Sequence, residues 1–128
     1  MARYALVIGI AEYESKYLHP LPKAVADADA LAALLRQYAQ CERIKVLKGY
    51  VSNKQLAEAL VTLITKQADN YEVIIYFTGH SIAVKCCLGD DTVYLTTSDC
   101  HIVLENGQPT NQTNAISFSE RNYSGLKK

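Results

Sequence analysis

Two side chains that can do acid–base chemistry stand at the ends of predicted elements. His80 follows a glycine directly after an apolar run, and Asp27 lies near the start of a predicted helix. An imidazole titrates near neutrality and can exchange protons with a nucleophile, whereas a carboxylate can bind a basic side chain. The plain alternatives are that His80 is a capping or exposed loop residue and that Asp27 is favoured in a first helical turn by the helix dipole.

An alternation of strands and helices positions these side chains. Apolar runs rich in β-branched residues predict buried strands, which cover 4–10, 44–47 and 73–77. Helical spacing predicts a helix of about four turns from Lys23, and Ser52 with Gln55 is a capping-box signature for a second helix. The expected apolar stripes are Ala24, Ala28, Leu31, Leu35 and Tyr38 in the first helix and Leu56, Leu60, Leu63 and Ile64 in the second.

The β-α-β-α-β order indicates an α/β fold with an open, mainly parallel sheet and helices on both faces. Ligands of such sheets bind outside the carboxyl ends of the strands, where the segments 11–27 and 78–80 converge. Asp27 and His80 are therefore expected to open into one crevice, although 53 positions separate them in the sequence.

The pattern is weaker after His80. We expect a loop at 81–91, a short strand at 92–95 and a hairpin or loop at 100–113 around Asn106-Gly107. One domain over 3–118 is expected, followed by an irregular tail at 119–128, so the chain should end before a doubly wound sheet of about five or six strands is complete.

Composition narrows the class of protein. The chain has 128 residues, 49% of them apolar, with 13 basic and 13 acidic residues and a formal charge of zero. Nucleic-acid binding is disfavoured because no excess of positive charge exists, and no apolar run approaches the roughly 20 residues of a membrane span. The four cysteines show no disulfide framework, so we expect a cytoplasmic protein with reduced thiols.

Three segments resemble the start of a caspase-like cysteine peptidase domain, closest to its metacaspase and bacterial orthocaspase branch. They are 4–10, 21–28 and 74–80, and the most specific part is the aromatic-Thr-Gly-His sequence that ends at His80. The order and spacing continue through Tyr94 to Cys100, so the similarity covers roughly 3–118.

This resemblance implies a Cys-His dyad that hydrolyses peptide bonds. On the matching positions His80 resembles the catalytic histidine, Asp27 the acid that binds a basic residue before the cut, and Thr78 a residue lining that pocket. Gly79 and Ser81 flank the histidine in the oxyanion region, although the family usually has glycine where Ser81 stands. The implied partner is a peptide or protein substrate with an Arg or Lys at the cut.

The nucleophile is the main departure from the family. Its segment, Asp-x-Cys-His-x-Gly-like, follows a further apolar strand, and no such segment occurs after residue 118. Cys100 follows Asp99 but lies only 20 residues after His80, so an ordinary thiol is the favoured interpretation, and Cys86 with Cys87 is expected to be inert. We therefore expect a truncated domain that is inactive alone, complemented by a C-terminal half or a full-length relative.

No cofactor is expected, and calcium is the one metal that stays open as an alternative. A zinc site would draw on Cys86, Cys87, Cys100 and His101, but no Cys-x-x-Cys spacing exists. Calcium activates many metacaspases and would use Asp90, Asp91 and Asp99, yet these residues lack the spacing of a defined calcium loop.

Two other functions compete with the peptidase. A non-catalytic interaction module of the same fold would bind basic peptides through Asp27 and need no nucleophile. A phosphate- or nucleotide-binding doubly wound domain is disfavoured, because Gly9 stands alone after the first strand and no Walker sequence is present.

Overall fold

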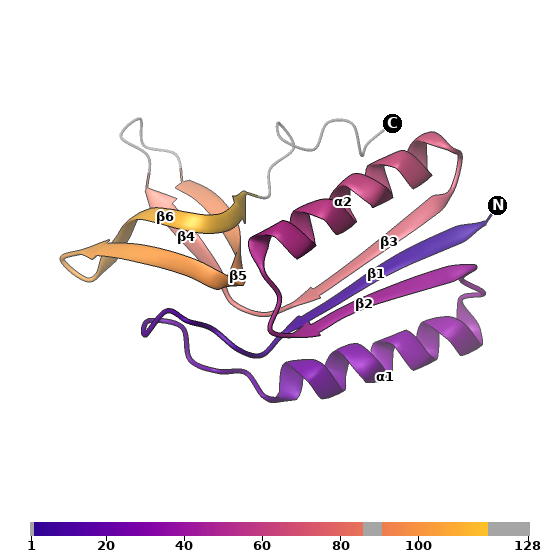
Figure 1. Ribbon diagram of the computed structural model, residues 1–128, viewed down its shortest axis with the longest axis horizontal. Helices are drawn as coiled ribbons and strands as arrows, with labels where there is room; N and C mark the ends of the chain where they lie inside the picture. Colours follow the sequence, from indigo (N-terminus) through magenta and orange to yellow (C-terminus); the bar gives the residue numbers. More distant parts are fainter. Residues whose placement is uncertain (1, 86–90, 118–128) are drawn as a thin grey trace.

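Two sheets and two helices make up the part of the chain that the computed structural model describes, residues 2–85 and 91–117 (Figure 1). In chain order the elements are β1 (Arg3–Ile10), α1 (Lys23–Tyr38), β2 (Arg43–Gly49), α2 (Asn53–Ala68), β3 (Glu72–Thr78), β4 (Ser81–Lys85), β5 (Asp91–Glu105) and β6 (Gln108–Ser117). The expected tail at 119–128 lies outside the described residues.

The first sheet is parallel and has the strand order β2-β1-β3. The three predicted strands and two predicted helices that build it are confirmed, and their ends fall close to the expected positions. β1 lies at the centre, and nearly all of its residues are buried because the strand is paired on both sides and covered by helices. The capping box at Ser52 and Gln55 is present in both directions and starts α2.

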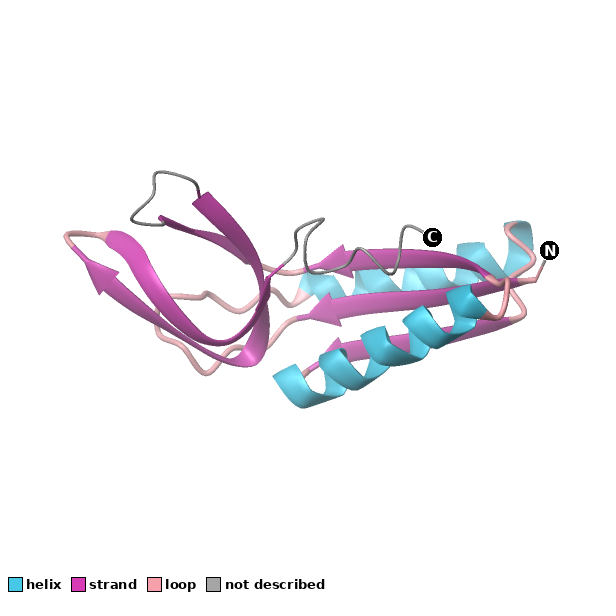
Figure 2. Cartoon of the chain, turned by 90° about the horizontal axis from the view of Figure 1, so that it is seen from above, coloured by secondary structure: helices cyan, strands magenta, loops and turns pink. Residues whose placement is uncertain are grey.

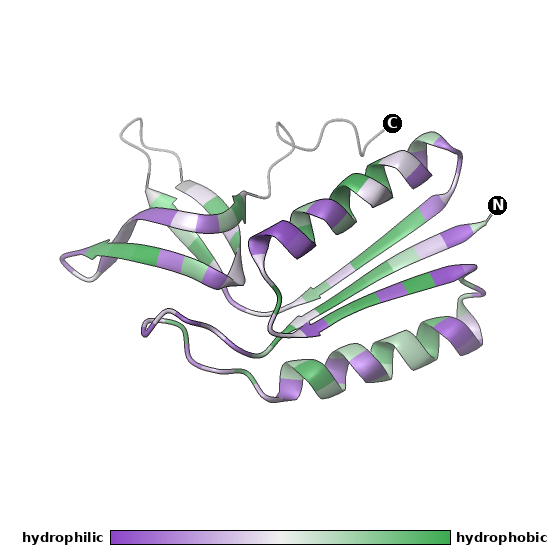
Figure 3. Ribbon diagram, viewed as in Figure 1, coloured by the Kyte–Doolittle hydropathy of each residue, from purple (hydrophilic) through white to green (hydrophobic). Residues whose placement is uncertain are grey.

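The helices pack on β1 through different residues. The even-numbered residues of β1, from Tyr4 to Ile10, form one apolar cluster with Leu56, Leu60 and Leu63 of α2. Figure 3 shows hydrophobic segments along both of these elements. α1 approaches β1 at Gly9, where an added Cβ would stand 2.4 Å from the carbonyl oxygen of Ala24.

The predicted stripes need two corrections. α1 buries the small residues Ala24, Ala28 and Ala32, and Tyr38 at its far end is 72% exposed. In α2 the buried line runs through Leu56, Ala59, Leu60 and Leu63, so Ile64 turns outward and is 38% exposed.

The second sheet is antiparallel, with the order β4-β5-β6, and lies beyond the carboxyl ends of the parallel strands (Figures 1 and 2). The prediction of a mainly parallel sheet therefore holds only for the strands up to Thr78, the end of β3. The loop expected at 81–91 was wrong for 81–85, which pairs as β4, and the short strand at 92–95 is part of a fifteen-residue β5.

The predicted hairpin at Asn106-Gly107 is confirmed. It joins β5 to β6, and both turn residues have positive φ, 53° and 77°, as a two-residue hairpin turn favours. Neither helix of the described residues is long and apolar enough to cross a membrane.

A buried polar stretch of β5 ties the two sheets together. Thr96, Thr97 and Ser98 are fully buried. The Ser98 hydroxyl oxygen accepts the main-chain N–H of Val51 at 2.7 Å, and its carbonyl accepts the N–H of Glu14 at 2.8 Å. β5 is thereby anchored both to the segment before α2 and to the loop after β1.

Candidate functional site

His80 lies between β3 and β4, at the carboxyl end of the parallel sheet. Its main chain is held on both sides. The N–H donates to the Tyr13 hydroxyl oxygen at 2.8 Å, and the carbonyl accepts the Thr96 N–H at 3.1 Å and the Thr96 hydroxyl at 2.6 Å. Residue 80 is therefore fixed by the loop after β1 and by β5, which are distant from it in sequence.

The His80 imidazole has a defined contact of its own. Its Nε2 lies 2.8 Å from the carbonyl oxygen of His19, and its ring packs at a tilt of 59° on Tyr13 with the ring centroids 5.0 Å apart. A carbonyl can only accept, so this contact is a hydrogen bond when Nε2 carries the proton. The neutral ring then has an unprotonated Nδ1, which can act as a base.

The contacts of the residues next to His80 explain why glycine stands before the histidine in the Thr-Gly-His sequence. A Cβ on Gly79 would stand 2.8 Å from the Tyr13 hydroxyl oxygen and 3.0 Å from Phe77, so only glycine lets Tyr13 come this close. Thr78 is half-buried and pairs in register with Gly9 of β1. Ser81 is exposed and opens β4 opposite Leu95.

Tyr13, His19 and Thr96 were not predicted as site residues. Tyr13 is half-buried, and burial raises the pKa of its phenol, with smaller opposing effects from the hydrogen bonds to Thr96 and His80. The phenol is therefore neutral near pH 7. No motif marks these three residues, because each reaches His80 through the tertiary fold alone.

Asp27 is the fifth residue of α1 and is exposed. The first turn of α1 contains no acidic residue, so the helix-dipole explanation of Asp27 was wrong. Within residues 2–85 and 91–117 its carboxylate has no hydrogen-bond or ion-pair partner, unlike Asp29, which pairs with Lys48 at 2.8 Å. The predicted crevice shared by Asp27 and His80 stays a prediction.

Cys100 is fully buried in the middle of β5. Desolvation raises the pKa of its thiol to about 11; a main-chain hydrogen bond from Thr97 opposes this shift and the charge of Asp99 adds to it. A thiol with this pKa is almost wholly protonated near neutrality and is a poor nucleophile. Cys86 and Cys87 lie outside the described residues.

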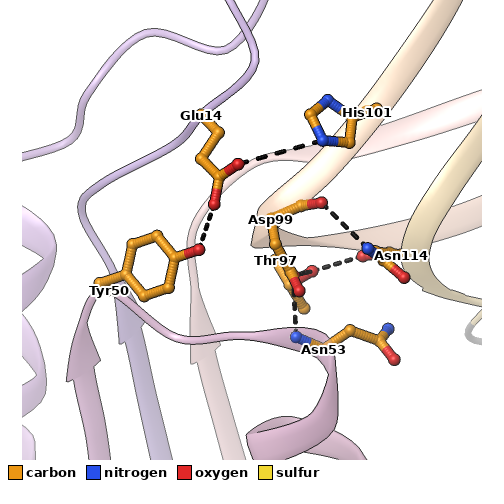
Figure 4. Close-up of polar contacts among 7 residues, drawn as sticks. All are labelled: Glu14, Tyr50, Asn53, Thr97, Asp99, His101 and Asn114. Atoms are coloured by element: carbon orange, nitrogen blue, oxygen red, sulfur yellow. Dashed lines mark hydrogen bonds and ion pairs between the residues drawn. The ribbon is translucent and has the colours of Figure 1, made fainter.

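Asp99 acts as a structural acceptor. Its Oδ1 receives the main-chain N–H of Asn53, at the start of α2, and the hydroxyl of Thr97, both at 2.9 Å. Asn114 donates from Nδ2 to the Asp99 carbonyl at 3.3 Å (Figure 4). The carboxylate thus caps α2 and joins it to β5, and the main-chain carbonyl of the same residue links β5 to β6.

Beside this group, Glu14 bridges two elements (Figure 4). It accepts the hydroxyl of Tyr50, which raises the pKa of that phenol to about 12, and its other oxygen lies 4.0 Å from Nε2 of His101. In the described part of the chain no three His, Cys, Asp or Glu side chains gather so that they could hold a metal ion. Cys86 and Cys87, which were considered as zinc ligands, and Asp90, which was considered as a calcium ligand, fall outside it.

Comparison with known proteins gives one family. The family model described as the caspase domain matches residues 2–120, which include β1 to β6 and the whole environment of His80. No curated protein matches the chain.

Proposed function

The chain belongs to the caspase domain family, and on that premise we propose that it is a cysteine-peptidase domain in which His80 is the general base and acid. Membership of the family points to a peptidase-type function. The observation that carries the assignment of His80 is the contact between its Nε2 and the His19 carbonyl, which leaves Nδ1 free to take a proton.

The proposed reaction is an acyl transfer through a thioester. A thiol gives its proton to Nδ1 of His80, and the thiolate sulfur attacks the carbonyl carbon of the scissile peptide bond. The imidazolium then returns the proton to the leaving amine nitrogen as the C–N bond breaks. Water, deprotonated by the same nitrogen, attacks the carbonyl carbon of the thioester. The C–S bond breaks, and the imidazolium returns its proton to the departing thiolate sulfur. The His19 carbonyl accepts Nε2–H and keeps the ring oriented throughout.

We place the nucleophile outside the described residues. Cys100 is buried and has a raised pKa, and Cys41 lies between α1 and β2, away from the carboxyl ends of the strands. We infer that a complementing C-terminal segment or a full-length relative supplies the thiol, and we propose that the domain is of the metacaspase and orthocaspase branch. Without it the domain is inactive, because a base that lacks its nucleophile loses nearly the whole rate enhancement.

We propose that the substrate has a basic residue, Arg or Lys, immediately before the scissile peptide bond. The loop that touches the His80 ring through His19 leads directly into α1, and Asp27 follows eight residues after His19. Its carboxylate, which has no partner among residues 2–85 and 91–117, can form a charge-assisted, bidentate pair with a guanidinium group. Thr78, at the end of β3, would line the same site.

The substrate proposal is tested by peptide binding to the chain as it stands. Acetyl-Gly-Arg-amide should shift the amide resonances around both Asp27 and His80, and Asp27→Asn should weaken binding at least about tenfold because a charged pair is lost. Acetyl-Gly-Gln-amide is the control peptide and Asp29→Asn the control variant, since Asp29 already pairs with Lys48. Equal binding of the two peptides, or equal effects of the two variants, would refute the role of Asp27.

A non-catalytic peptide-binding module is the alternative, favoured by the buried state of Cys100. A fluorogenic Arg-peptide assay separates the two functions. Hydrolysis by the chain or by its complex with the thiol-bearing partner, abolished both by alkylation and by His80→Ala, excludes a binding-only role. Binding that depends on Asp27 without any hydrolysis supports that role.

A further inference from the structure

We propose that Tyr13 and Thr96 are positioning residues for His80, which they hold through a closed ring of hydrogen bonds around its main chain. This inference rests on the proposed function only in treating the direction of the imidazole as important. Neither residue would touch the substrate or the reacting atoms.

The ring consists of three contacts. The Thr96 hydroxyl donates to the His80 carbonyl oxygen at 2.6 Å and is also directed at the Tyr13 hydroxyl oxygen, 3.4 Å away. The Tyr13 hydroxyl oxygen also accepts the His80 N–H at 2.8 Å. The contacts therefore close a circuit from His80 through Tyr13 and Thr96 back to His80.

Both hydroxyl groups are held in place by their surroundings. Thr96 is fully buried, and its own N–H donates to the same His80 carbonyl. Tyr13 packs against the main apolar cluster, and its hydroxyl oxygen lies over Gly79. In this half-buried site hydrogen bonds are stronger than in water, and members of a closed circuit polarise one another.

The hydrogen-bond ring also fixes the orientation of the His80 imidazole. The Tyr13 ring packs on the His80 ring, and the loop that carries Tyr13 also carries His19, whose carbonyl receives Nε2–H. Breaking the hydrogen-bond ring at Tyr13 would free both the main chain of residue 80 and the loop that orients its side chain. If Tyr13 and Thr96 had a merely structural role, their loss would lower stability without changing the motion of the His80 imidazole.

The test compares Tyr13→Phe, Thr96→Val and the double variant with Tyr17→Phe, an exposed tyrosine of the same loop. The measurement is the ¹³C order parameter of the His80 ring, alongside the free energy of unfolding in urea. We expect the order parameter to fall from about 0.85 to below about 0.6 in either single variant. The double variant should show no further fall, because one break opens the circuit, and Tyr17→Phe should match the wild type.

An unchanged His80 order parameter in folded Tyr13→Phe would overturn the inference, and so would single effects that simply add in the double variant. If Thr96→Val does not fold, Thr96→Ser is measured instead, because it keeps the hydroxyl. An ordered His80 imidazole in Thr96→Ser together with a disordered imidazole in Tyr13→Phe supports the circuit. Imidazoles that are similarly ordered or disordered in both variants contradict it. No readout uses hydrolysis or peptide binding, so failure here and failure of the proposed function are distinguishable.

Discussion

Replacing Gly9 by valine is expected to destabilise the domain by about 3 kcal/mol or more, the upper end of what overpacking a core costs. An added Cβ would stand 2.4 Å from the carbonyl oxygen of Ala24 and 2.8 Å from Cβ of Ala28. The first contact is with the backbone of α1, which no change of rotamer can relieve. The helix that carries Asp27 would have to move away from β1, and the site with it.

Urea unfolding followed by circular dichroism measures this loss. Ala30→Val is the matched control, because it adds a larger branched side chain at an exposed position of the same helix and should cost less than about 0.7 kcal/mol. A Gly9→Val variant as stable as Ala30→Val would show that α1 does not pack on β1 at this distance.

Cys100 is expected to react with iodoacetamide about 100-fold more slowly than an ordinary thiol at pH 8. Its pKa is raised from 9.0 to about 11, so the thiolate fraction falls by about two powers of ten, and burial blocks access further. Cys41, which is half-buried and lies outside any strand, is the internal comparison. Peptide mapping by mass spectrometry at successive times gives both rates from one sample.

The control is the same labelling in guanidinium chloride, where unfolding should bring the two rates to within a few-fold of each other. Fast labelling of Cys100 in the folded chain would contradict its placement inside β5. It would also restore Cys100 as a candidate nucleophile and remove the need for a thiol from elsewhere.

The sequence was informative where local pattern and burial agree. β1 is an unbroken apolar run because it is paired on both sides, and Ser52 with Gln55 marks the start of α2 by a contact within one helical turn. The turn at Asn106-Gly107 could also be predicted from the sequence, because such a turn needs two residues that tolerate positive φ.

Only part of the candidate site could be predicted from the sequence. His80 stands out because a strand ends just before it, but its partners are long-range: Tyr13 is 67 positions away and His19 is 61. β4 was missed because five residues of modest apolar alternation, Ser81 to Lys85, form a strand only when β5 pairs with them. Asp27 was found by its position on α1, and its role is still a prediction.

The most direct test of the account is the hydrogen bond of the His80 imidazole, measured by NMR on protein labelled with ¹⁵N and ¹³C. We predict that the neutral ring is protonated at Nε2, with a coupling across the hydrogen bond to the carbonyl carbon of His19, and that Nδ1 carries no proton. A proton on Nδ1, or a ring with no coupling to His19, would contradict the assignment of His80 as the base.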